Sequence, residues 1–562
     1  MAPGMSRETE SYECLRDNNN GTSSPKANGI TTSGAATDEA GEHSPLLSIS
    51  SREDPVNDPP IRPRQWLSRM RLTQVLILIV ILASAGDQLQ ESPQTRILES
   101  IICYRYYEVA DPGKLLLDRG SVGPGAIGGV AEIHCKVNAV QEQLAMLRGY
   151  QQLLDGIPAL LLALPFGWAA DRFGRKPLLS MGLLSLVFRF AWIQLVTWFW
   201  QIFDVRMTWL STLHACFGGG SAVTTGIFFV ILSDITPEAE RASVFLQAGA
   251  SSLLANLVMS PLSAWWMQTD PWIPNLIGIL ICVSTLLALP FIPETLGARP
   301  ESSLTSSRPS TPSGESAARP QDIAGASELV STDLLARWSA RFRDATSFLT
   351  QDWRILALCL SFFGHTLIAS SSQLLLQYMS KRYNIIFADA TMLLTVYNGV
   401  KVLLLFVLLP YLSTLSMRTF RLSGQTKDLY LARASQVCVL IGFTLIGFTP
   451  NVPTVVMSMA VASLGTGIYL LIRSFITSLV PGHHIARVYS IITLVDTIGA
   501  MLGGPILAGL FKSGLTLGDS WIGLPFYFLG LMNAAFAVLV FAVRLRPDEG
   551  RIKLDDEEPG KL

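Results

Sequence analysis

The stretch Gly167-Trp168-Ala169-Ala170-Asp171-Arg172-Phe173-Gly174-Arg175-Lys176 separates two long apolar segments of the chain. One apolar run ends at Gly167, and another starts at Pro177. Because a helix needs about 20 mostly apolar residues to cross a bilayer, both runs are long enough to span it. The stretch therefore predicts a compact polar turn between two membrane-spanning helices.

The same residues resemble the loop signature of the major facilitator superfamily, G-x-x-x-D-R-x-G-R-[RK], at every specified position. In that family the loop lies on the cytoplasmic side, between the second and third membrane helices. Asp171 and Arg175 occupy the positions that the family uses as a latch on this face. The alternative is that the cations of the loop only fix the topology. The resemblance implies a transporter whose gating loop contains Gly167, Asp171, Arg172, Gly174, Arg175 and Lys176.

The composition of the chain also indicates a membrane protein. Hydrophobic residues make up 49% of its 562 residues and charged residues only 15%, which is too apolar for a soluble chain of this length. We predict an all-α integral membrane protein with twelve transmembrane helices in two pseudo-symmetric six-helix halves, the major facilitator fold. The predicted spans are 72–96, 144–168, 177–199, 208–233, 242–266, 274–293, 354–378, 388–412, 435–450, 454–480, 487–511 and 523–544.

A weak internal repeat supports the division into halves. Leu164-Pro165-Phe166 recurs as Leu409-Pro410-Tyr411, and a nearly identical offset aligns Gly219 with Gly465. Polar sequence rich in Ser, Pro and Gly precedes the first span and separates the halves, as is typical of tails and linkers. The predicted parts are a disordered N-terminal tail (1–71), a first half (72–296), a linker (297–350), a second half (351–545) and a C-terminal tail (546–562).

The distribution of basic residues predicts the orientation. Lys and Arg near the ends of membrane helices are retained on the cytoplasmic side, and they concentrate on the side that carries Arg172, Arg175 and Lys176. With twelve spans, this side also receives both tails. We therefore predict that the two tails and the linker are cytoplasmic.

Charged and polar residues within the predicted spans are candidates for the solute pathway. An ionised group at the centre of a membrane helix costs on the order of 3 kcal/mol on insertion scales, so it usually faces a cavity or a partner. Asp87, Glu91 and Gln94 form one polar stripe on the first predicted helix. The full set of candidate proton or substrate residues is Asp87, Glu91, Gln94, Arg189, His365, Gln373, Gln377, Lys401, Arg473 and Asp496.

Two roles remain open for the acidic members of this set. A partly desolvated carboxylate can bind and release a proton, so Asp87 and Asp496 are candidates for proton coupling. The alternative is a permanent structural ion pair, for example of Asp496 with Arg473 or of Asp87 with Arg189. Pairing is favoured for Asp496, whereas the roles of Arg189 and Lys401 remain undecided.

The segment from Pro93 to Tyr107, together with a following long loop that contains Cys135, resembles a fungal group of facilitator proteins without an assigned substrate. That group is distantly similar to proton-coupled folate transporters. Cys103 and Cys135 are the two cysteines in the long loop on the predicted outer side. Because that compartment is oxidising, we predict a disulfide between them.

No G-x-x-x-x-G-K-[ST] phosphate loop is found in the sequence, which disfavours a pump that hydrolyses ATP. The sequence predicts a secondary transporter that works by alternating access and exports a small organic metabolite or drug-like compound against proton entry. The alternatives are a proton-coupled uptake symporter and, with less support, a non-transporting membrane sensor or a multi-pass enzyme. We expect no enzyme activity, no cofactor, no metal site and no nucleic acid partner. A small-molecule substrate, protons as co-ion and the lipid bilayer are the expected partners of a monomer.

The N-terminal tail contains Glu42-His43-Ser44-Pro45-Leu46-Leu47, in which Glu42, Leu46 and Leu47 resemble an acidic dileucine sorting signal. Such a signal directs proteins to vacuolar or endosomal membranes. We predict a multi-pass protein of the plasma membrane, with the vacuolar or endosomal membrane as the alternative.

Overall fold

The computed structural model describes residues 63–117, 130–295, 353–419, 424–480 and 485–544, and these residues are mainly helical. Within these ranges, 11 helices are long and apolar enough to cross a membrane, or up to 12 if the bent pair Asn138–Ala163 and Pro165–Phe173 forms one span. The predicted all-α membrane fold is therefore confirmed. The proposed sorting residues Glu42, Leu46 and Leu47, the linker 297–350 and the C-terminal tail 546–562 lie outside the described residues.

The first half contains eight α-helices and three short 3-10 segments among the described residues. Its elements are α1 (Pro63–Ala110), α2 (Lys114–Leu117), η2 (Glu132–Lys136), α3 (Asn138–Phe173), α4 (Arg175–Trp198), η3 (Val205–Leu213), α5 (His214–Gly218), α6 (Gly220–Ile235), α7 (Glu238–Met267), α8 (Trp272–Ala288) and η4 (Leu289–Phe291).

The second half repeats the helical pattern over its described residues. Its elements are α10 (Trp353–Arg382), α11 (Phe387–Leu403), the π-helical turn η6 (Leu404–Leu408), α12 (Leu409–Thr419), α13 (Gly424–Phe448), α14 (Val452–Leu464), α15 (Ile468–Leu479), α16 (Ile485–Leu517), η8 (Asp519–Trp521) and α17 (Leu524–Ala542).

Several helices are longer than predicted. Helix α1 runs on to Ala110 instead of ending near residue 96, and α3 begins at Asn138 instead of residue 144. Polar side chains in these extensions, such as Glu99 and Gln141, are fully buried against other protein groups. Hydropathy identifies segments that face lipid, so it ends a predicted span where the helix becomes covered by protein.

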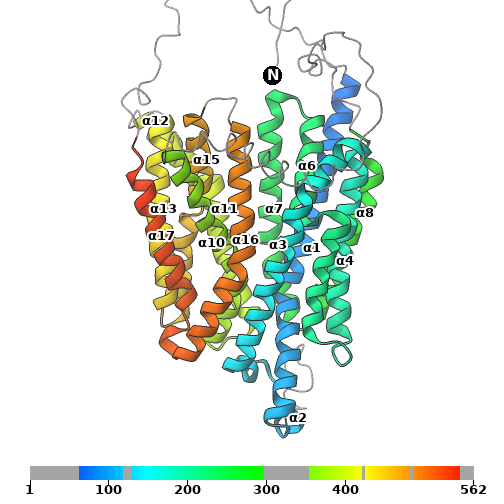
Figure 1. Cartoon of the computed structure of the whole chain (residues 1–562), viewed down its shortest axis with the longest axis vertical. Helices are drawn as coiled ribbons and strands as arrows, with labels where there is room; N and C mark the ends of the chain where they lie inside the picture. Colours follow the sequence, from blue (N-terminus) through cyan, green and yellow to red (C-terminus); the bar gives the residue numbers. More distant parts are fainter. Residues whose placement is uncertain (1–62, 118–129, 296–352, 420–423, 481–484, 545–562) are drawn as a thin grey trace, which may run out of the picture. The chain divides into compact units, whose positions relative to one another are not determined.

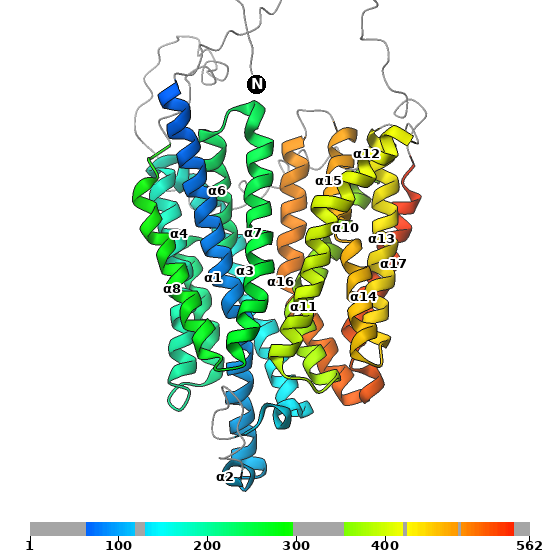
Figure 2. The same ribbon diagram turned by 180° about the vertical axis from the view of Figure 1, so that it is seen from behind.

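The two halves meet along two helix seams. Helix α3 packs against α16, and α7 packs against α11 (Figures 1 and 2). We call the end of the bundle with the α3–α4 turn the loop end, and the end with Cys103 and Cys135 the disulfide end. Along the first seam, contacts extend from Asn138, whose side-chain amide donates to the Leu515 carbonyl, to Gly156, where a Cβ would collide with Met501.

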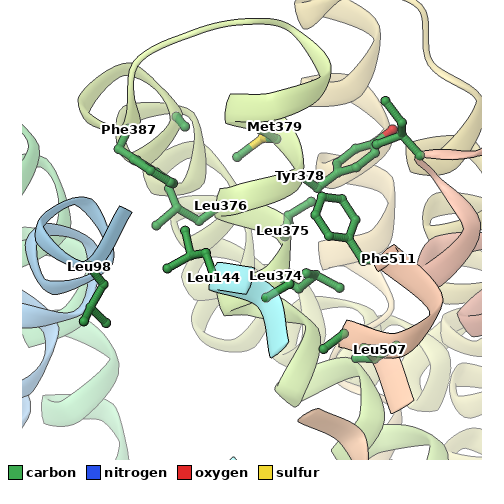
Figure 3. Close-up of a cluster of buried hydrophobic side chains, with 14 of the residues drawn as sticks. Leu98, Leu144, Leu374, Leu375, Leu376, Tyr378, Met379, Phe387, Leu507 and Phe511 are labelled. Carbon is green, nitrogen blue, oxygen red and sulfur yellow. The ribbon is translucent and has the colours of Figure 1, made fainter. Parts of the chain in front are cut away.

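Three buried apolar clusters differ in which halves they join. The largest contains residues of both halves and lies at the disulfide end, where Leu144 of α3 projects toward Leu374 and Leu376 of α10 (Figure 3). A second cluster contains only residues of the second half, and a third contains only residues of the first half. Ala170 of the third cluster lies near the α3–α4 turn. The halves are therefore packed together at the disulfide end, whereas at the loop end each half has its own core.

Close packing at the α3–α16 seam depends on Gly149. A Cβ at this position would lie 2.8 Å from the Gly504 carbonyl oxygen and 2.8 Å from the Ala508 Cβ. We expect Gly149→Ala to disfavour this closed seam by about 1–3 kcal/mol, the usual cost of overpacking. Reaction of a maleimide with a cysteine introduced at the buried position Leu507 should become faster. Gly226→Ala is the control, because a Cβ there meets no atom within 4 Å, and equal rates for the two variants would contradict the expectation.

Candidate functional site

The gating loop forms a tight turn that requires glycine. Helix α3 ends at Phe173, Gly174 has φ +102°, and α4 begins at Arg175. Only glycine adopts such a φ readily. The Glu294 carboxylate caps the new helix, accepting hydrogen bonds from the backbone N–H of Arg175 at 2.9 Å and of Lys176 at 3.2 Å. A negative group at a helix N-terminus is stabilising, so Glu294 fixes the start of α4.

The side chains of the gating loop contact their own half. Arg175 forms an ion pair with Asp234 at the end of α6, and the Arg172 guanidinium lies 5.1 Å from the Trp168 ring centroid. Asp171 is exposed and forms no hydrogen bond or ion pair with any described residue. Gly167 faces open space. A latch between Asp171 and the second half is thus not formed in this conformation, and its existence stays a prediction.

A cluster of charges in the first half joins three helices. Arg189 of α4 donates to the Asp155 carboxylate of α3 at 2.7 Å, so its ion-pair partner is Asp155 and not Asp87 as the alternative had suggested. Arg148, also on α3, donates to the Gln94 side-chain oxygen at 2.9 Å and to the Thr95 hydroxyl at 2.8 Å. These neutral partners leave the charge of Arg148 without a directly bonded carboxylate.

The predicted stripe on α1 contributes three groups with different surroundings. Gln94 is buried, whereas Glu91 is half-buried and accepts a hydrogen bond from Gln88 at 3.3 Å. Asp87 is exposed and forms no hydrogen bond or ion pair with a described residue, although Arg189 acts on it electrostatically. Asp87 is therefore the carboxylate of this cluster with the most freedom to exchange a proton or contact a solute.

In the second half, the structure brings two predicted residues, Arg473 and His365, to the carboxylate of a third, Asp496. Arg473 of α15 donates to Asp496 Oδ2 at 3.2 Å, and Thr366 donates to Asp496 Oδ1 at 3.0 Å. His365 Nδ1 lies 3.9 Å from Asp496 Oδ1, and its ring centroid is 3.7 Å from that of Tyr469. Asp496 thus has the structural pairing with Arg473 that was one of the two sequence interpretations.

Lys401, within α11, has no carboxylate partner among the described residues. Its Nζ lies 5.0 Å from the ring centroid of Tyr397, one turn earlier on α11. The π-helical turn Leu404–Leu408 follows directly, and such interruptions are frequent at functional sites. A cation in a membrane helix with only an aromatic partner is a candidate for contact with a solute.

The remaining predicted residues, Gln373 and Gln377, lie on the seam between the halves. They line a small cavity of about 30 Å³ together with Arg148, Gln152 and residues of α16. Gln377 is buried and donates to the Gln141 carbonyl at 2.6 Å and to its side-chain oxygen at 2.9 Å. Gln152 donates to the Ser370 hydroxyl at 2.8 Å. Polar groups of both halves therefore meet where α3 faces α10, beside the α3–α16 seam.

Two charged residues of the site were missed by the sequence reasoning. Arg148 and Asp155 lie inside the predicted span 144–168, and their spacing of seven places them on one helix face. The criterion that selected Asp87, a charged residue within a predicted membrane span, applies equally to Arg148 and Asp155. In the structure, Cys103 and Cys135 are joined by an S–S bond of 2.06 Å.

The fold and this arrangement of intramembrane charges define a multi-pass membrane transporter built from two helical halves. Residues 140–504 match the family model described as Major Facilitator Superfamily, and the chain belongs to this family. It is therefore a secondary transporter and not an enzyme. Among solved structures, the nucleoside transporter NupG covers 84% of this chain over 99% of its own length, with a TM-score of 0.53 and 13% identity. At this identity, the likeness supports the fold alone.

Relatives of similar length are fungal proteins. The "MFS efflux pump atnC" of Emericella nidulans is 30% identical over 91% of this chain and 94% of its own length. The "Efflux pump ustT" of Aspergillus flavus is 29% identical over 79% of this chain and 82% of its own length. The general resemblance noted in the sequence is therefore confirmed, with fungal efflux pumps among the relatives.

Proposed function

We propose that this protein exports a small organic metabolite against proton entry by alternating access. The observation that carries the proposal is that the membrane helices of each half hold a cluster of charged side chains, with Arg189 paired to Asp155 in the first half and Arg473 paired to Asp496 in the second. Asp87, Arg148 and Arg189 come from the first half, and Lys401 and Arg473 come from the second. The direction of transport is taken from the efflux pumps to which the chain is similar.

The two halves carry opposite balances of charge in these clusters. The first half places Asp87, Glu91 and Asp155 beside two arginines, and this excess of carboxylates suits proton binding. The second half contributes Lys401 and Arg473 against the single carboxylate of Asp496. Proton exchange is therefore assigned to the first half, with Asp87 as its main group, and polar contact with the solute is assigned to the second half.

The predicted orientation gives the conformation a functional meaning. If the loop end faces the cytoplasm, the end at which the halves share a buried core is the outer one, so the proposed cycle admits the solute from the inside in this conformation. We propose that the protein is a monomer in the plasma membrane, with the vacuolar or endosomal membrane as the alternative location. The finer likeness to proton-coupled folate transporters rests on residues 93–107 and carries no substrate assignment.

Untargeted mass spectrometry of cells and medium from a deletion strain and its parent tests the proposal. We expect at least one compound to accumulate in the deletion cells and to decrease in their medium, and the full-length chain to restore the parental pattern. Complementation with Asp87→Asn should fail to restore it. A compound left unused in the medium of the deletion strain would contradict export and would support uptake by proton symport.

A further inference from the structure

A buried cluster of charges at the disulfide end has no role in the solute pathway described above. Glu99 of α1 is 0% exposed and accepts hydrogen bonds from Lys136 Nζ at 2.9 and 3.1 Å and from the Gln141 amide at 2.5 Å. Arg96, one turn earlier on α1, lies 3.4 Å from Glu99. Together with the bond between Cys103 and Cys135, these contacts attach η2 firmly to α1 of the first half.

Glu132, at the start of η2, connects this cluster to the second half. Its carboxylate pairs with Arg96 Nε at 2.8 Å and with Lys136 Nζ at 3.0 Å. Its Oε1 also accepts a hydrogen bond of 2.6 Å from the backbone N–H of Phe387, the first residue of α11. The carboxylate therefore caps the N-terminus of a second-half helix, where negative charge is favoured.

The charge of Glu132 is held by its neighbours. Burial alone would raise the pKa of this carboxyl, but Lys136, Arg96 and the Phe387 N–H outweigh burial and lower it below its ordinary value. Glu132 consequently stays ionised at neutral pH, and its hydrogen bond to α11 is assisted by a full charge. Such hydrogen bonds are roughly twice as strong as neutral ones.

Two more bonds cross between the halves beside Glu132. Lys381 of α10 donates to the Lys136 carbonyl at 2.5 Å, and Gln377 donates to Gln141. The Lys136 ammonium group itself lies 4.0 Å from the Phe387 ring centroid. The segment from Glu132 to Gln141 is thus fixed to the first half by covalent and ionic bonds, and it is joined to the second half by hydrogen bonds that can be broken.

We propose that Glu132 is the positioning residue of a gate at the disulfide end, an inference that rests on the alternating access of the proposed function. When this end is closed, Glu132 caps α11 and holds the second half against η2. When it opens, the Phe387 hydrogen bond breaks, while the ion pairs with Arg96 and Lys136 remain and keep the carboxylate neutralised. The gate therefore opens without exposing an unpaired buried charge.

The test measures opening directly, in the full-length protein purified into lipid nanodiscs. Leu376 is 2% exposed in the large apolar cluster at this end, so a cysteine placed there reports opening by its reaction with a bulky maleimide. The same chain without the added cysteine gives the background from native thiols. We expect Glu132→Gln to accelerate labelling by about tenfold, because the hydrogen bond to α11 loses its charge.

Glu142→Gln is the matched control, because Glu142 of α3 pairs across the halves with Lys512 of α16 at 2.7 Å, and these two side chains are 31% and 48% exposed. Exposed pairs contribute little, so we expect labelling to change by less than about fivefold. A labelling rate for Glu132→Gln equal to that of the control would overturn the gate.

If Glu132→Gln does not fold, Glu132→Asp replaces it as the test variant, because the shorter aspartate side chain keeps the charge but loses contact with α11. Accelerated labelling of this variant supports the gate, and an unchanged rate overturns it.

Because labelling is measured without a substrate, the gate and the export proposal can be tested independently of each other. Accelerated labelling in a protein that moves no metabolite would leave the gate intact and contradict export. Export by a protein whose labelling does not depend on Glu132 would contradict the gate and leave export intact.

Discussion

Replacing Asp87 with asparagine is expected to lower proton-driven solute movement by roughly 100-fold or more, the scale on which loss of a proton-transfer group reduces a rate. Asp87 lies on α1, exposed and free of hydrogen bonds to described residues, with Arg189 acting on it electrostatically. Asparagine has nearly the same size but cannot bind and release a proton. Flux of the metabolite identified in the deletion strain should be measured in vesicles, with and without an imposed pH gradient.

The control for this variant is Asp111→Asn, which removes an exposed carboxylate beyond the end of α1. Both variants should reach the membrane in the amount of the parent protein and unfold at the same temperature. Asp87→Asn should still exchange labelled for unlabelled solute, because exchange at equilibrium needs no net proton movement. Normal pH-dependent flux in Asp87→Asn would exclude Asp87 as the coupling group.

The membrane fold could be predicted from the sequence because its main determinant is local. Each lipid-facing helix must satisfy its own backbone and present an apolar surface, so spans such as α4 and α8 are visible in the residues themselves. The turn around Gly174 is also local, because a φ of +102° favours glycine whatever surrounds it. Helix ends such as Ala110 depend on burial by other parts of the protein, and hydropathy does not detect that burial.

Individual residues of the candidate site could be proposed from the sequence, but their ion-pair partners could not. The cost of burying charge identified Asp87, Arg189 and Asp496 without any knowledge of the fold. The choice of Asp155 as the partner of Arg189 depends on how α3 and α4 pack, which is a tertiary property. The sequence likewise does not determine which end of the bundle is closed, because one chain must form both states during transport.

The buried charge cluster at the disulfide end gives the largest expected effect on stability. Glu99 is 0% exposed and neutralises Lys136 and Arg96, which are themselves 5% and 1% exposed. Removing one partner of a buried ion pair leaves an uncompensated charge and costs about 3–5 kcal/mol. We expect Glu99→Gln to lower the unfolding temperature sharply and to reduce the yield of folded protein, as measured by thermal unfolding of the purified protein in detergent.

Glu108→Gln provides the matched control, because it is the same change on the same helix at an exposed position. It should unfold at the same temperature as the parent protein, and equal unfolding temperatures for Glu99→Gln and Glu108→Gln would show that the cluster is not needed for stability.

Comparison with Glu132→Gln separates the contribution of the cluster to stability from its contribution to the gate. Glu99 contacts only first-half residues and so stabilises the closed and open states alike, whereas the additional hydrogen bond of Glu132 to α11 stabilises the closed state alone. Gate opening should therefore be accelerated by Glu132→Gln and not by Glu99→Gln, although each variant removes an ion-pair partner of the buried Arg96 and Lys136.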